Sequence, residues 1–240
     1  MNRVTRITGM ALAAGVLLAG GTRMRGQAVA PAPSTAGAVV GTGTFTAFVE
    51  NMDRSLAFYH DAFGMDVPPL PATGERPYNQ ANPQLFDMFD IAGAKERHQS
   101  ARMAGTAVNV ELMEIQNVDH KVIPMRPQDP GTATLVFIVR DLDAAIARVK
   151  DARGTIVTPG GAPVMLADRS RALLIRDADS RPVELRQAPG TPVAAAATTS
   201  RAANLLEHRI SIAVDDLDKT MRVYRELLGF SGTSDEKFTR

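Results

Sequence analysis

Three segments of this chain carry the same pattern, and this internal repeat constrains the fold more than any other feature. Each segment begins with a short β-rich run that ends at an Asp, over residues 45–53, 135–143 and 210–218. The Asp suits a helix N-cap, and apolar residues at helical spacing follow it. Eleven residues after each Asp stands a glycine, Gly64, Gly154 or Gly229, which can take the left-handed conformation that ends a helix. Agreement at strand, cap and stop predicts a repeated structural unit.

Short strands are expected after the helix in the first two units. Residues 107–115 read as a strand of the first unit, and residues 155–158, 172–176 and 182–186 as strands of the second. The unit is therefore expected to be a strand, a helix and three further strands (βαβββ). The third unit reaches residue 240 without closing strands, so we expect it to be poorly stable alone. Truncation relative to a longer parent is the favoured explanation, and packing on the main domain or on another chain is the alternative.

The first thirty residues are typical of an export signal. Arg3 and Arg6 precede an apolar run from Gly9 to Gly20, which is too short to span a bilayer. The chain has no Cys, which excludes disulfides and thiolate sites and fits a place outside the reducing cytosol. We expect a periplasmic or secreted protein that leaves the membrane once the signal is cleaved; an uncleaved, disordered N-terminus is the alternative.

These features divide the chain into five parts. They are a signal peptide (1–30), a flexible leader (31–41), a domain of two modules (42–117 and 132–188), a linker (189–206) and the start of a truncated third module (207–240). Lys and Arg number 27 against 26 Asp and Glu, a formal net charge of +1, so no nucleic acid partner is expected.

The repeat resembles the vicinal oxygen chelate superfamily, which includes glyoxalase I, bleomycin-resistance proteins and extradiol dioxygenases. The resemblance rests on the strand–Asp–helix–Gly unit, on Ser55 to Tyr59 and Tyr224 to Phe230, and on the Val-Glu-Leu runs at 110–112 and 183–185. It implies an α+β fold in which paired βαβββ modules form a cupped, open-barrel mixed sheet with helices outside, plus an incomplete third module. Because this scaffold hosts many functions, it indicates little about chemistry.

In relatives that hold a metal, the resemblance implies a His near the start of each unit's first strand and a Glu in its last strand. Thr44 and Thr134 stand at the two His positions, whereas Glu111 and Glu184 keep the Glu positions. Two carboxylates and two hydroxyls suit a transition metal poorly. We therefore expect no cofactor in the first two modules, with a weakly held divalent metal as the alternative.

Strand alternation predicts which residues line the cleft between the modules. The predicted lining is Thr44, Thr46, Phe48, Glu111, Met113, Thr134, Val136, Ile138 and Glu184. Glu114 has the opposite parity to Glu111 and should leave the cleft. His208 is a weak candidate ligand in a complete third module, because Arg209 occupies the ligand register and a one-residue slip turns a strand side chain to the other face. His98 lies in a polar stretch and is expected to be exposed.

Three functions follow from this cleft. The first is binding of an amphipathic small molecule without a tightly held metal, as the bleomycin-resistance branch of the resemblance implies. The second is a metal-dependent enzyme, a glyoxalase-type lyase or isomerase or a dioxygenase, whose catalytic modules are incomplete in this chain. The third is a degenerate structural or interaction module. The resemblance also allows a homodimer, and the catalytic residues stay unassigned.

Overall fold

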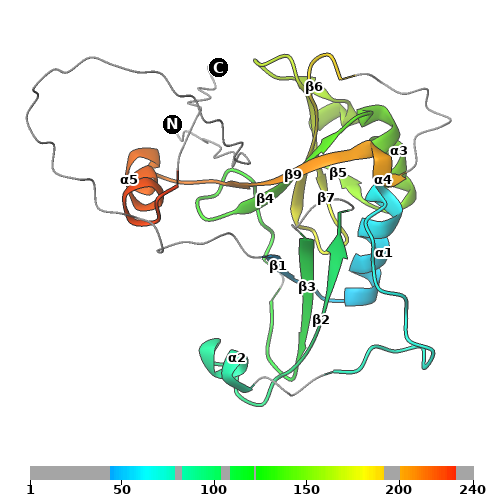
Figure 1. Ribbon diagram of the computed structural model, residues 1–240, viewed down its shortest axis with the longest axis vertical. Coiled ribbons are helices and arrows are strands. Elements are labelled where there is room, and N and C mark those ends of the chain that lie inside the picture. Colours follow the sequence, from blue (N-terminus) through cyan, green and yellow to red (C-terminus); the bar gives the residue numbers. More distant parts are fainter. Residues whose placement is uncertain (1–43, 79–82, 104–108, 122, 192–200, 231–240) are drawn as a thin grey trace, which may run out of the picture.

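The computed structural model of the chain describes residues 44–78, 83–103, 109–121, 123–191 and 201–230 (Figure 1). The expected signal peptide and leader lie outside these residues. The fold is α+β, with mixed sheets and helices and no closed barrel. None of the described helices is long and apolar enough to cross a membrane.

The first unit forms a three-stranded sheet. Its elements are β1 (Phe45–Phe48), α1 (Met52–Phe63), α2 (Pro83–Met88), β2 (Lys95–Arg102) and β3 (Asn109–Gln116). The strand order is β1-β3-β2, with β1 parallel and β2 antiparallel to β3. In the described part of this unit, the first of the three expected closing strands is reduced to an isolated bridge between Asp66 and Arg102.

The second unit forms most of a six-stranded sheet. Its elements are β4 (Ala133–Val139), α3 (Leu142–Asp151), β5 (Thr155–Ile156), the 3-10 turn η1 (Pro159–Gly161), β6 (Val164–Met165), β7 (Arg171–Arg176) and β8 (Pro182–Gln187). The strand order is β5-β7-β8-β4-β9, and β6 pairs with β7. As β1 does with β3, β4 runs parallel to the closing strand of its own unit, β8.

The third unit contributes the last strand of that sheet. It consists of α4 (Arg201–Asn204), β9 (Leu205–Ile212), α5 (Leu217–Arg222) and the π-helical turn η2 (Val223–Leu227). Strand β9 pairs antiparallel with β4, while α5 stands apart from both sheets (Figure 1). The predicted linker 189–206 therefore already contains α4 and the start of β9. Sequence alone could not place these, because what fixes β9 is its long-range pairing with β4.

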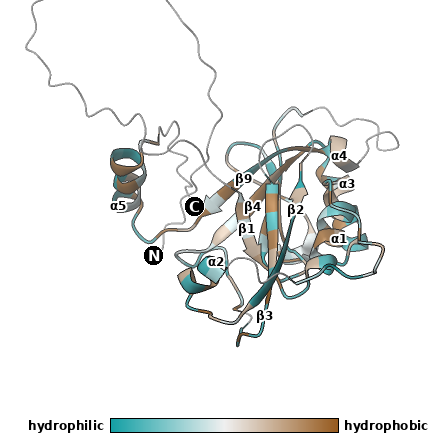
Figure 2. Ribbon diagram, turned by 60° about the horizontal axis from the view of Figure 1, so that its bottom comes forward, coloured by the Kyte–Doolittle hydropathy of each residue, from teal (hydrophilic) through white to brown (hydrophobic). Residues whose placement is uncertain are grey.

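One hydrophobic core joins the first two units. Helices α1 and α3 lie together on one side of the strands in both views (Figures 1 and 2). Between them and the sheets, the rings of Phe63 and Phe137 pack 4.6 Å apart, and Tyr59 is fully buried beside them. Helices α1 and α3 do not cover the opposite face of either sheet (Figures 1 and 2).

The helices begin two residues earlier than the sequence predicts. The N-caps are Asn51, Asp141 and Asp216. Each is extended, and its side chain accepts the backbone N–H three residues later, so the cap directly follows the strand. The predicted caps Asp53, Asp143 and Asp218 lie in the first turn, where a negative charge still favours the helix dipole.

The predicted glycine stops hold in two units and differ in one. Gly64 and Gly229 have φ of 68° and 72°. In the second unit Arg153 takes the left-handed conformation, with φ of 64°. Gly154 is needed for another reason, since a Cβ there would lie 2.6 Å from Val149 Cγ1 and 2.9 Å from Phe58 Cε2.

Candidate functional site

The first part of the predicted cleft lies on the sheet face that points away from α1. Register places Thr46 beside Glu111 and Phe48 beside Met113, and Thr46 Oγ1 donates to Glu111 Oε2 over 2.7 Å. Thr44 is exposed and donates to Asn109 Oδ1 over 3.3 Å. Phe48 is 50% exposed. Glu114 has the opposite parity and leaves this face, as predicted; it is buried, and its carboxylate accepts the Met52 N–H at the start of α1.

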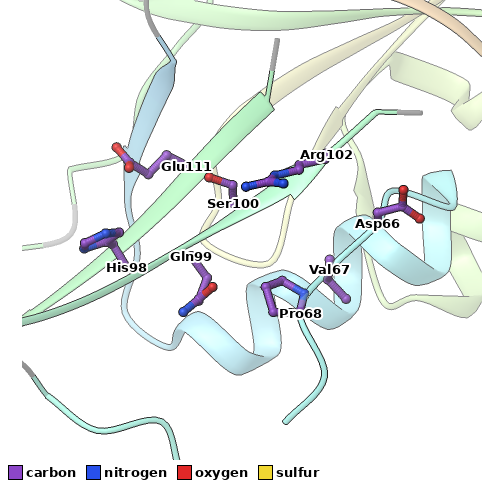
Figure 3. Close-up of a pocket in the computed structure, with 8 residues that line it drawn as sticks. All are labelled: Asp66, Val67, Pro68, His98, Gln99, Ser100, Arg102 and Glu111. Atoms are coloured by element: carbon purple, nitrogen blue, oxygen red, sulfur yellow. The ribbon is translucent and has the colours of Figure 1, made fainter. Parts of the chain in front are cut away.

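A cavity of about 470 Å³ opens along β2 on this part of the molecule (Figure 3). We call it the unit-one cavity; its lining is Asp66, Val67, Pro68, His98, Gln99, Ser100, Arg102 and Glu111. Glu111 is the single member of the predicted cleft in this lining. Four of the others, His98, Gln99, Ser100 and Arg102, come from β2, a strand that the sequence pattern does not predict, and Asp66, Val67 and Pro68 come from the segment that follows α1.

The position of His98 on β2 gives it a partner that the sequence does not predict. The sequence predicts an exposed histidine in a polar stretch, and the side chain is indeed 51% exposed. Its Nδ1 lies 2.8 Å from Oε2 of Glu96, a carboxylate that is only 3% exposed. The two residues are two positions apart on one strand, so they share a face. The sequence could have indicated this arrangement, because Glu96, His98, Ser100 and Arg102 follow one another at the i, i+2 spacing of one strand face.

A second cavity, of about 450 Å³, lies on the sheet of the second unit. We call it the unit-two cavity; its lining is Arg126, Pro127, Gln128, Thr134, Val157, Thr158, Val164, Leu166, Ala172, Leu173, Leu174, Arg176, Glu184, Ser211 and Ala213. Eight of these fifteen side chains are apolar, and the polar ones include Arg126 and Arg176. Thr134 and Ser211 pair across β4 and β9 and therefore present their hydroxyls on the same face.

The charge of Glu184 is compensated within its own strand. The residue is 3% exposed, and Oε1 accepts a hydrogen bond from Arg186 Nε over 3.1 Å. Val136 and Ile138 lie on the same face, beside Glu184 and Arg186, but they are buried and do not line the cavity. The cavity therefore combines apolar walls with a small polar floor and no isolated charge at Glu184.

Three of the predicted cleft residues line these two cavities. Glu111 lines the unit-one cavity, whereas Thr134 and Glu184 line the unit-two cavity. The third unit completes the unit-two cavity. Its strand β9 pairs with the edge of β4, and Ser211 and Ala213 line the cavity. A single cleft shared by the first two modules stays a prediction. Which strand pairs with which edge is a long-range contact that repeat spacing does not encode.

His208 lies on the face away from the unit-two cavity. It pairs with Phe137, whose side chain is in the core, and the two rings are 6.5 Å apart. Burial lowers the pKa of His208 below 6.5, although Glu207 opposes this shift. Arg209, in register with Val136, takes the cavity side and pairs with Glu207 over 2.7 Å.

These positions do not form a set of donors suited to a transition metal. The structure gives hydroxyls at Thr44 and Thr134, a carboxylate bound by Arg186, and an imidazole on the opposite face. Among the residues that the structure describes, no three His, Cys, Asp or Glu side chains gather closely enough to hold an ion.

Residues 41–184 match the family model of the Glyoxalase/Bleomycin resistance protein/Dioxygenase superfamily. The chain belongs to this superfamily. The match spans the first unit and nearly all of the second, in agreement with the two βαβββ units of the resemblance. No curated protein matches the chain in sequence.

Solved structures are similar to this chain at low sequence identity. A glyoxalase family protein from Bacillus cereus has a TM-score of 0.51 at 12% identity, over 62% of this chain and 94% of that one. A glyoxalase I mutant from Zea mays has a TM-score of 0.49 at 17% identity, over 78% of this chain and 55% of that one. The fosfomycin resistance protein FosX from Listeria monocytogenes, solved with Mn(II) and sulfate, has a TM-score of 0.38 at 14% identity, over 63% and 95%.

Proposed function

We propose that this superfamily member binds an amphipathic small molecule in the unit-two cavity, without a tightly held metal. The observation that carries the proposal is the composition of the cavity: about 450 Å³ of space with mostly apolar walls and the polar groups Thr134, Glu184 and Ser211 together. Ligand sites are commonly concave, mostly apolar and oriented by a few polar groups.

The polar floor favours a ligand that donates hydrogen bonds. Thr134 and Ser211 offer hydroxyls that donate or accept, and Glu184 only accepts while it is ionised. Because Arg186 already offsets the charge of Glu184, a fully charged cation gains little there. We therefore infer a hydroxyl or amide group on an apolar body.

The donor chemistry also favours a site without a transition metal. The two threonines replace the imidazoles that metal-holding relatives are expected to have, and Arg186 competes for Glu184. The residues of the unit-two cavity therefore do not favour a metal-dependent enzyme.

The test is a thermal-shift screen of the whole chain against a small-molecule library, repeated on variants. A ligand present at a hundred times its Kd stabilises the folded state by about 2.7 kcal/mol, which is a measurable shift. Leu174→Asn places an amide in the apolar wall of the unit-two cavity and should abolish the shift. Val67→Asn makes the same kind of change in the unit-one cavity and should leave it intact. A thermal shift that Val67→Asn abolishes and Leu174→Asn leaves intact would refute the assignment to the unit-two cavity.

We also propose export of the protein, on the basis of the basic start and the short apolar run before residue 21. Mass spectrometry of the protein from a bacterial host should find a mature N-terminus near residues 28–31 in the periplasmic fraction. An intact Met1 start in the cytosolic fraction alone would contradict this.

A further inference from the structure

The charges that line the unit-one cavity lack partners of opposite charge. Among the described residues, no ion pair involves Asp66, Arg102 or Glu111, and Glu111 accepts a hydrogen bond only from the hydroxyl of Thr46. On the other face of the same sheet, by contrast, Arg97 and Glu114 pair at 2.7 Å. The cavity thus holds both signs of charge without their cancelling each other.

These charges lie at two ends of the cavity. His98, Ser100 and Arg102 share one face of β2, and register sets Glu111 opposite Ser100. Figure 3 shows Glu111 and His98 toward one end, Ser100 in the middle and Arg102 toward the other. Diagonal neighbours of this kind are about 7–8 Å apart. This spacing leaves room for a small group between Glu111 and Arg102.

His98 adds an acceptor at the Glu111 end. Because Nδ1 faces the buried carboxylate of Glu96 at 2.8 Å, we assign the proton to Nδ1. The remaining ring nitrogen, Nε2, is then an acceptor in the lining of the cavity. One end therefore accepts hydrogen bonds from a cation, while Arg102 and Ser100 donate at the other.

We propose that the unit-one cavity is a second binding site, for a small zwitterion of the α-amino acid class. Arg102 and Ser100 bind the carboxylate, Glu111 and His98 Nε2 bind the ammonium, and Val67 and Pro68 contact an apolar side chain. A simple anion would leave Glu111 uncompensated at one end, and a simple cation would leave Arg102 uncompensated at the other. A molecule with both charges satisfies both ends.

Isothermal titration of the whole chain with three matched probes tests this site. The probes are L-leucine, 4-methylpentanoate and 3-methylbutylamine, which share a branched apolar group and differ in charge. Leucine should bind, and the affinity of each singly charged analogue should be lower by a factor of about ten or more. A factor of ten corresponds to about 1.4 kcal/mol of binding free energy. Equal binding of the three probes, or no leucine binding to folded protein, would overturn the proposal.

Variants locate the binding and separate it from the proposed function. Arg102→Gln and Glu111→Gln should each weaken leucine binding about tenfold. Lys150→Gln and Asp151→Asn remove exposed charges from the end of α3 and should leave it unchanged. Leu174→Asn in the unit-two cavity should also leave leucine binding unchanged. The two proposed binding sites are therefore tested independently of each other. Leucine binding that survives Arg102→Gln would contradict the assignment.

Discussion

At the scale of single residues, Glu114 ties three segments to β3. Its carboxylate accepts the Met52 N–H over 2.8 Å, Arg97 Nη2 over 2.7 Å and the Tyr78 hydroxyl. Burial alone would raise the pKa of Glu114, but these hydrogen bonds outweigh it and lower the pKa from 4.5. Strand parity predicts which face Glu114 occupies. It cannot predict these partners, because Tyr78 reaches the site from a loop.

Tyr78 provides a test at alkaline pH. Burial, followed by the hydrogen bond to Glu114, raises its pKa from 10.0 to about 12. A raised pKa favours the protonated phenol in the folded state, so its contribution is complete below pH 10 and is lost as pH rises through about 12. Ultraviolet titration should show that Tyr78→Phe loses one phenol ionisation near pH 12. Loss of an ionisation near pH 10 instead would contradict the network.

At the scale of elements, the repeat predicts the first strand and helix of every unit. It places the caps two residues late, because two acidic or amide residues flank each helix start and both suit a cap. Strand β2 escapes prediction because Lys95 to Arg102 carries polar side chains on both faces, which is typical of an edge strand. Helix α2 is six residues long, too short for a periodic signal.

The corrected cap gives a prediction for α3. Asp141→Ala removes the acceptor of the Ala144 N–H, so the free energy of unfolding should fall by about 1 kcal/mol in urea denaturation. Asp143→Ala, the cap that the sequence predicts, removes an exposed pair with Arg171 and should cost clearly less. A larger loss at Asp143 would show that the helix begins where the sequence places it.

At the scale of the whole molecule, the second unit has two neighbours of different kinds. With the first unit it shares a core, reinforced by Asp177, which accepts from the Tyr59 hydroxyl over 2.9 Å, and by Asp179, which accepts from Glu50 N–H over 2.9 Å. With the third unit it shares a sheet edge and the unit-two cavity. The sequence predicts the units, but not these pairings, which depend on contacts far apart in the chain.

Asn204 secures the third unit to the second. Its Oδ1 accepts the Asp141 N–H over 2.8 Å, and its Nδ2 donates to the Asp141 carbonyl over 3.0 Å. Asn204→Ala leaves the buried Asp141 N–H unpaired, while the Asp141 carbonyl keeps the Ala145 N–H; the change should cost about 2 kcal/mol and speed hydrogen exchange in β9. Gln84→Ala, an exposed site on α2, is the control. Unchanged exchange in β9 would contradict this docking.

We propose that the unit-two cavity binds a small molecule through Thr134, Glu184 and Ser211 and needs no metal. The most direct measurement is titration of chelator-treated protein with the best compound of the thermal-shift screen, with and without added Zn²⁺ or Mn²⁺. We expect one ligand per chain and an affinity that the metals do not change. Binding only after stoichiometric uptake of either metal would contradict it.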